Sequence, residues 1–95
     1  MSARQEQIWY NAVESVALER ARQDDNGYEE THDMIVWLTM LMEGVGKLSQ
    51  ETLWERLNGV KSPDFRAEAV RVAAVALAMI EQIDRDNDEL GGEKQ

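Results

Sequence analysis

The sequence predicts an all-α protein. Apolar residues recur at the three-to-four-residue spacing of one helix face over long stretches of the chain. The 95 residues include a single proline and are mostly good helix formers, and no run alternates Val, Ile or Thr with polar residues as a strand would. The length suits one domain. We place that domain at residues 1–85 and expect a flexible acidic tail at 86–95.

A first amphipathic helix is expected over 2–23. Its apolar residues fall on one face: Ile8, Trp9, Ala12, Val13, Val16 and Ala17. The turn-forming run Asp-Asp-Asn-Gly at 24–27 should end it, since glycine can adopt a left-handed helix cap. Thr31 or Asp33 can then cap the next helix.

The second helix, expected over 33–48, carries two neighbouring rows of side chains. The row that we expect in the core is Met34, Leu38, Leu41, Val45 and Leu48, and the chemically mixed row is Asp33, Trp37, Met40, Gly44 and Lys47. Gly44 and Gly46 each cost about 1 kcal/mol relative to alanine inside a helix. They therefore indicate the close approach of another helix or of a ligand. A shorter helix should follow at 49–58 and stop at Asn58-Gly59.

The last long helix is expected over 63–85, because Ser62 can cap it and Pro63 suits its first position. Its middle, AVRVAAVALAMI at 69–80, is apolar almost all round, as in helices that are buried on several sides. Four helices of one chain can hardly surround it. We therefore expect a four-helix protomer that assembles as a homodimer or homotetramer through this helix.

The composition limits the possible partners and the compartment. Nineteen acidic against ten basic residues give a net charge of −9, which disfavours binding to nucleic acid; an acidic surface that engages a basic protein partner is the alternative. The chain has no cysteine, which excludes disulfides and thiolate metal sites and fits the cytoplasm. No apolar run approaches the roughly 20 residues of a membrane span, so no membrane association is expected.

The residues identify no catalytic group. There is one histidine, His32, no cysteine, and no serine in a G-x-S-x-G setting, so triad hydrolases are excluded. The segment Gly44-Val45-Gly46-Lys47 is too short for a phosphate-binding P-loop. Glu43 and Glu68 are the plausible inward-facing acids. Each has a cation one turn later, Lys47 or Arg71, with which it can form an ion pair within its helix.

These residues resemble the MazG-like, all-α nucleoside triphosphate pyrophosphohydrolases. The resemblance covers roughly residues 28–85 and begins with His32 and the amphipathic run that follows it. The segment E-G-V-G-K-L at 43–48 is similar to E-E-V-G-E-L of the family. The segment RAEAVRVAAVA at 66–76 is similar to the family's E-x-x-D motif and the small-residue helix that follows it. Family enzymes hold Mg²⁺ with the E-E-x-x-E and E-x-x-D acids, and a water attacks between the α and β phosphorus atoms.

The resemblance implies a degenerate metal site. Glu43 and Glu68 match family acids, whereas Gly44, Lys47 and Arg71 replace the other three. The two remaining carboxylates are too few for the metal cage. We therefore expect that hydrolysis is lost and that the protein needs no cofactor. The alternative is an active, divergent pyrophosphohydrolase that uses other acids, such as Asp33 or Glu30, to hold Mg²⁺.

Two arrangements of the cations remain open. Lys47 and Arg71 can replace the metal and bind the phosphates of a nucleotide or another phosphorylated small molecule, with His32 and Trp37 contacting the base. Alternatively, Lys47 pairs with Glu43 and Arg71 with Glu68, and these salt bridges close the pocket together with Met40. In the second case the chain is a scaffold for protein interaction.

Overall fold

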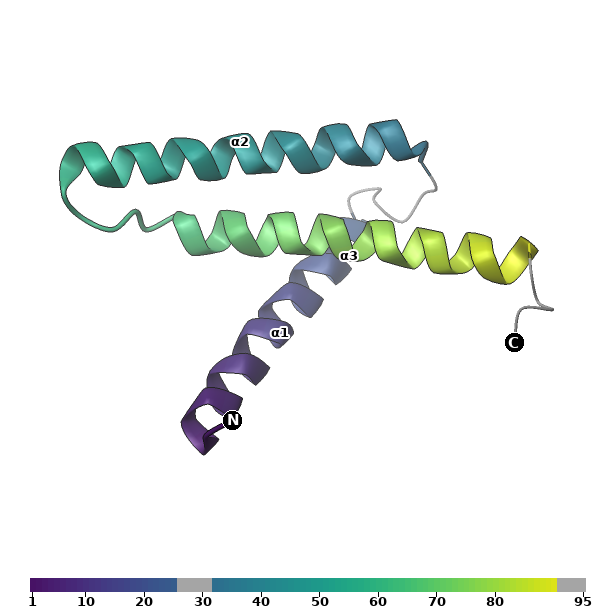
Figure 1. Cartoon of the computed structure of the whole chain (residues 1–95), viewed down its shortest axis with the longest axis horizontal. Helices are drawn as coiled ribbons and strands as arrows, with labels where there is room; N and C mark the ends of the chain where they lie inside the picture. The colour runs from purple at the N-terminus through teal and green to yellow at the C-terminus, as the bar shows by residue number, and fades with distance from the viewer. Residues whose placement is uncertain (26–31, 91–95) are drawn as a thin grey trace.

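The computed structural model describes residues 1–25 and 32–90, and these form three helices and no strand. Helix α1 spans Ala3–Gln23, α2 spans Met34–Asn58 and α3 spans Phe65–Leu90. Helices α2 and α3 lie side by side as an antiparallel hairpin, and α1 leaves α3 at a steep angle (Figure 1). The all-α prediction is confirmed, but the prediction of a four-helix protomer is wrong.

The expected break between the second helix and a shorter fourth one does not exist. Helix α2 continues through Leu48 and Ser49, where the sequence holds neither a proline nor a glycine that would stop it. The Thr52 Oγ1 hydroxyl donates to the carbonyl of Leu48 (3.0 Å), so even the polar side chains here bond within the helix. The two predicted segments are therefore one helix of 25 residues.

The ends of the helices follow the predicted signals more closely. The Ser2 Oγ accepts a hydrogen bond from the Gln5 amide (3.1 Å) and caps α1. Gly59 ends α2 in the left-handed conformation, with φ of 72°. Ser62 Oγ accepts from the Asp64 amide (3.2 Å), but α3 begins at Phe65, so the predicted start with Pro63 at the first helical position is wrong by two residues. Helix α3 continues past the expected end near 85 to Leu90; the expected cap Thr31 and residues 91–95 lie outside the described ranges.

The core of the protomer is small and lies between α2 and α3. Its buried apolar residues are Trp37, Ala74, Val75 and Ala78. The row of α2 that was expected in the core is largely exposed instead: Leu38 retains 45% of its accessible surface, and Met34 and Val45 are also exposed. This prediction is corrected because Trp37 and Gly44, from the other row, face α3.

Gly44 is a point of close contact between α2 and α3. A Cβ atom added to Gly44 would lie 2.7 Å from Cγ2 of Val72, which is too close for any side chain. The predicted close helix contact is thus confirmed at Gly44. It is wrong at Gly46, where nothing in the described part of the chain lies within 4 Å of an added Cβ.

The C-terminal half of α1 is anchored to α3, beginning at Ser15, whose Oγ accepts from Arg66 Nη2 (3.0 Å). The guanidinium of Arg20 is buried and donates two hydrogen bonds to Glu81, at 3.1 and 3.0 Å, and also pairs with Asp24. The Gln23 side-chain amide donates to the carbonyl of Arg71 (3.3 Å). Residues 3–14 of α1 are exposed throughout. None of the helices in the described ranges combines the length and the apolar character that crossing a membrane would require.

Candidate functional site

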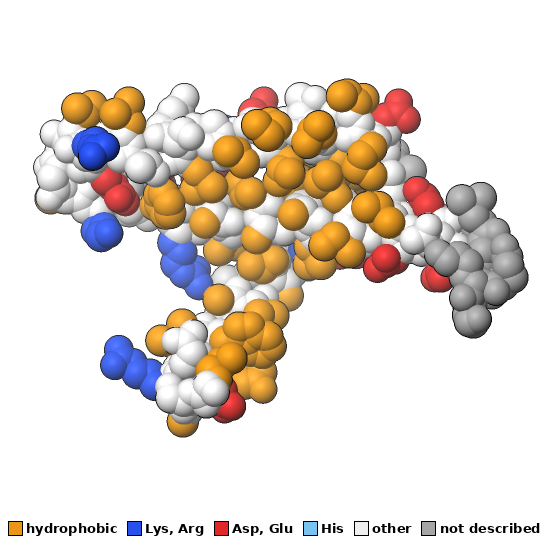
Figure 2. All heavy atoms as spheres, in the orientation of Figure 1, with side chains coloured by type: hydrophobic (Ala, Val, Ile, Leu, Met, Phe, Trp, Pro, Cys, Tyr) orange, Lys and Arg blue, Asp and Glu red, His pale blue; other side chains and the backbone are white. Residues whose placement is uncertain are grey.

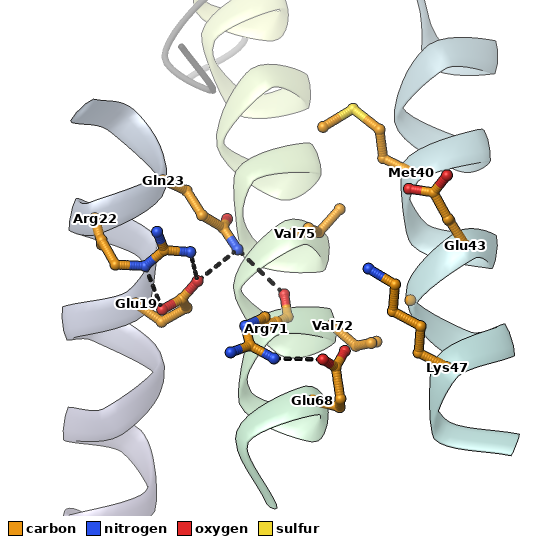
Figure 3. A pocket seen from close by; sticks show the side chains of 11 residues that line it. Glu19, Arg22, Gln23, Met40, Glu43, Lys47, Glu68, Arg71, Val72 and Val75 are labelled. Carbon is orange, nitrogen blue, oxygen red and sulfur yellow. Dashed lines mark hydrogen bonds and ion pairs between the residues drawn. The ribbon is translucent and has the colours of Figure 1, made fainter. Parts of the chain in front are cut away.

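A pocket of about 160 Å³ lies where the end of α1 meets α2 and α3. Figure 3 shows side chains from all three helices directed into it. Its lining residues are Glu19, Arg22, Gln23, Met40, Glu43, Gly44, Lys47, Glu68, Arg71, Val72 and Val75. This lining holds three carboxylates and three cations over a floor of valine and methionine.

The structure brings four of the predicted site residues together in this pocket. Glu43 and Lys47 are one turn apart on α2, and Glu68 and Arg71 are one turn apart on α3. The two helices run antiparallel, and the contact at Gly44 fixes their register, so the two pairs face each other. The sequence spacing within each helix predicted each pair. Only the packing of α2 against α3 brings the pairs together.

The two cations differ in their ionic partners. Arg71 pairs with Glu68 through Nη1 and Oε1, as the salt-bridge alternative predicts. Lys47 forms no ion pair with any residue of the described ranges, including Glu43. Its side chain extends from α2 towards α3 (Figure 3). The arrangement therefore lies between the two alternatives: one cation is neutralised by its neighbour, and the other keeps its charge available.

The end of α1 supplies three pocket residues that the sequence analysis missed. Arg22 donates to Glu19 through Nε (2.9 Å) and Nη2 (2.6 Å), and Gln23 also donates to Glu19 (3.3 Å). The hydrogen bond from Arg22 is the main reason that the pKa of Glu19 lies below its usual range, although burial acts in the opposite direction. The sequence shows that Glu19, Arg22 and Gln23 lie within one turn of each other on the same helix. It does not show the angle at which α1 crosses α3, and this angle brings them to the pocket.

His32 and Trp37 lie together elsewhere. Their rings are in edge-to-face contact with centroids 5.0 Å apart, and neither residue lines the pocket. Trp37 retains 1% of its accessible surface, and its Nε1 donates to Oε1 of the buried Gln82 (2.7 Å). The same oxygen accepts from the His32 amide (3.0 Å), and Gln82 Nε2 donates to the His32 carbonyl (2.7 Å). In this arrangement Trp37 has almost no surface with which to stack on a base.

The pocket offers both hydrogen-bond donors and acceptors, because its three cations are matched by three carboxylates. Lysine and arginine provide charge-assisted hydrogen bonds to phosphate, and the carboxylates hold the two guanidinium groups in place. Among the described residues, no group of three or more His, Cys, Asp or Glu side chains is arranged to hold a metal ion. Two other acids could replace the missing metal ligands according to the sequence analysis. Asp33 is exposed before the start of α2, and Glu30 lies outside the described ranges.

Comparisons with models of protein families, with curated proteins and with solved structures give no match for this chain.

Proposed function

We propose that this chain binds a nucleotide or another phosphorylated small molecule through its phosphate group, as a MazG-like protein that no longer hydrolyses its ligand. One observation carries the proposal. Lys47 lines a pocket together with Arg22 and Arg71, and it has no ionic partner within the described ranges. An available ammonium group beside two guanidinium groups is a favourable place for phosphate oxygens.

The size of the pocket supports binding by the phosphate rather than by the whole ligand. Its volume is about 160 Å³. Pockets that enclose a drug-sized ligand measure about 300–1,000 Å³. A phosphate group would therefore enter between α2 and α3, and a sugar and base would remain outside the pocket of the single protomer.

The same residues argue against hydrolysis by the mechanism of the family that the sequence resembles. Gly44, Lys47 and Arg71 occupy positions where that family has acids. The cations repel a divalent metal ion, and Glu68 is engaged by Arg71. The alternative function, divergent Mg²⁺-dependent hydrolysis, would need a third carboxylate at the metal; Glu19 lies in the same pocket, but the acids of the described ranges do not converge on one point. Glu19 is held by Arg22 and would have to exchange that partner for the metal.

Calorimetric titration tests the proposal directly. Inorganic phosphate, pyrophosphate and a panel of nucleotides are titrated without divalent ions into the wild type, Lys47→Gln and Lys61→Gln. Lys61 is an exposed lysine outside this pocket and serves as the matched control. We expect Lys47→Gln to weaken binding by about tenfold or more, since a hydrogen bond to a charged group contributes about 1.5–3 kcal/mol. Lys61→Gln should bind like the wild type.

The alternatives predict different results in the same experiments. Binding to the wild type should weaken as salt is added, because mobile ions screen the attraction. Release of pyrophosphate from nucleoside triphosphates in the presence of Mg²⁺ or Mn²⁺ would support the hydrolase. An absence of heat with every phosphorylated ligand would contradict both functions and favour an acidic scaffold that engages a protein partner.

We also infer that the chain functions as an oligomer, a dimer or a pair of dimers. A compact monomer of 10.9 kDa exposes about 5,600 Å² by the usual scaling of area with mass, whereas this chain exposes 7,062 Å². The excess is about 1,500 Å² for each protomer. Two such surfaces together equal about 3,000 Å², which lies within the range of obligate homodimer interfaces.

A further inference from the structure

A groove of about 370 Å³ lies between α1 and α3, next to the pocket of the proposed function. We call it the α1–α3 groove. Glu19, Arg22 and Arg71 line both the pocket and the groove, so the two spaces adjoin across these side chains. Figure 2 shows Lys and Arg side chains in the angle between α1 and the first half of α3. A ligand whose phosphate enters the pocket can therefore extend its remaining atoms into the groove.

The charge of the α1–α3 groove differs from that of the pocket. The pocket matches three cations with three carboxylates, whereas the described lining of the groove holds three arginines and one carboxylate, Glu19. Two of these arginines, Arg22 and Arg71, are paired with Glu19 and Glu68. The third, Arg66, has no ionic partner within residues 1–25 and 32–90. On a chain with a net charge of −9, this local excess of positive charge favours an anion in the groove.

Arg66 is held in position by a neutral partner. Its Nη2 donates to the Oγ of Ser15 on α1 (3.0 Å), and the same hydroxyl donates to the carbonyl of Asn11 (3.0 Å). The hydroxyl orients the guanidinium without neutralising its charge. Guanidinium groups bind phosphate with two parallel hydrogen bonds, and a side chain that is already ordered loses less entropy when it binds. Arg66 therefore combines a fixed position with a charge that no carboxylate of the described residues offsets.

We propose that the α1–α3 groove binds a second phosphate of the same ligand, and that the ligand is an organic bisphosphate. This inference rests on the proposed function and names the class of its ligand. One phosphate lies beside Lys47 in the pocket, and the other lies beside Arg66 in the groove. Arg66 and Arg71, which borders both spaces, are five residues apart on α3, or about 7.5 Å along the helix axis. The two phosphates are therefore joined by a linker longer than one shared oxygen atom.

The apolar side chains of the α1–α3 groove favour an organic linker over a chain of inorganic phosphate. Leu18, Ala67 and Val70 line the groove together with Arg66. The carbon atoms of a sugar or an alkyl chain can pack against these side chains and remove apolar surface from water. An inorganic polyphosphate would instead place charged oxygen atoms against them, which is unfavourable because the charges lose hydration.

Calorimetric titration with matched ligands tests the second phosphate site. Fructose 1,6-bisphosphate, fructose 6-phosphate and inorganic tripolyphosphate are titrated without divalent ions into the wild type and three variants. The wild type should bind the bisphosphate about tenfold or more tightly than the monophosphate, because the second phosphate adds charge-assisted hydrogen bonds. Arg66→Gln should remove this preference and leave the affinity for the monophosphate unchanged, whereas Lys47→Gln should weaken both ligands. Arg56→Gln, at an exposed arginine outside the pocket and the groove, should bind like the wild type.

Two measurements separate binding by Arg66 from its support of α1. Ser15→Ala removes the hydrogen bond to Arg66 but keeps the cation, so it should retain most of the preference for the bisphosphate. Nuclear magnetic resonance of the wild type needs no variant and stays informative if Arg66→Gln does not fold. The bisphosphate should shift the resonances of both Lys47 and Arg66, and the monophosphate should shift those of Lys47 alone.

The outcomes distinguish this inference from the proposed function. Equal affinity of the wild type for the two sugar phosphates, or an Arg66→Gln variant that keeps the preference, would overturn the second site and leave the phosphate pocket in place. Loss of the preference in Ser15→Ala to the same extent as in Arg66→Gln would show that Arg66 acts by supporting α1, and would also overturn the second site. Tighter binding of tripolyphosphate than of the bisphosphate would contradict the organic linker. An absence of binding with all three ligands would overturn the proposed function together with this inference.

Discussion

At the scale of single residues, Gln82 joins the start of α2 to α3. Its amide is buried and makes three hydrogen bonds, to Trp37 and to both backbone groups of His32. A buried indole N–H is costly unless it has an acceptor. Gln82 supplies that acceptor and at the same time fixes the segment that enters α2. The tryptophan that the sequence offers as a ligand contact is therefore part of the core.

Replacing Gln82 should test this role. Gln82→Leu removes the Oε1 that accepts from the Trp37 Nε1 and from the His32 amide. Each unsatisfied buried group costs about 1–3 kcal/mol, so we expect a loss of about 2–4 kcal/mol in the free energy of unfolding, measured with a chemical denaturant. Gln50→Leu, at an exposed position of α2, should have little effect. Equal stability of the two variants would show that the hydrogen bonds of Gln82 contribute nothing.

At the scale of helices, the two glycines of α2 have different roles although they are two residues apart. Gly44 allows α2 to lie against Val72, and Gly46 has no neighbour in the described ranges that a methyl group would touch. Glycine in a helix is unfavourable in either place. The helix therefore loses stability twice, and only the loss at Gly44 is offset by packing.

Alanine substitutions should separate the two glycines. We expect Gly46→Ala to stabilise the protein by about 0.5–1 kcal/mol, the usual difference in helix propensity. Gly44→Ala gains the same propensity but forces Val72 and α3 away, and such overpacking costs about 1–3 kcal/mol. Its net effect should be destabilising by up to about 2 kcal/mol. Thermal and denaturant unfolding measure both variants, and a stabilised Gly44→Ala would contradict the close contact of α2 with α3.

At the scale of the whole molecule, the protomer is extended. Its radius of gyration is 16.2 Å, compared with about 12 Å for a compact domain of this length. Much of the extension comes from α1, which projects from the hairpin (Figure 1). Burial alone would lower the pKa of Arg20, but hydrogen bonds with Glu81 and Asp24 outweigh burial and raise it, so Arg20 keeps its charge. This ionic contact helps to set the angle of α1.

Removing one partner of Arg20 should loosen α1 without unfolding the hairpin. Glu81→Gln takes away the carboxylate that accepts two hydrogen bonds from the buried guanidinium. We expect about 1–3 kcal/mol of lost stability and faster amide hydrogen exchange at residues 15–25, while exchange in α2 changes less. Asp84→Asn, at an exposed site one turn further along α3, is the control. If both variants exchange alike, the contact does not anchor α1.

The sequence by itself determined the three long helices, most of their ends, and the ion pair Glu68–Arg71, because helical spacing and capping are local properties. The same spacing also predicted the pair Glu43–Lys47, which the structure does not form. Local patterns could not show that α2 is continuous past Leu48. Ser49 can cap a new helix, but it does so only where the preceding residues have left the helical conformation, and the local sequence does not decide whether they have. Nor could they decide which of two neighbouring rows on α2 faces α3. Only the tertiary structure decided that Trp37 and Gly44 pack inwards and that Leu38 faces outwards. It also decided that Glu19 and Arg22 complete the pocket. The physical reason is that the orientation of one helix relative to another depends on contacts between residues far apart in the chain.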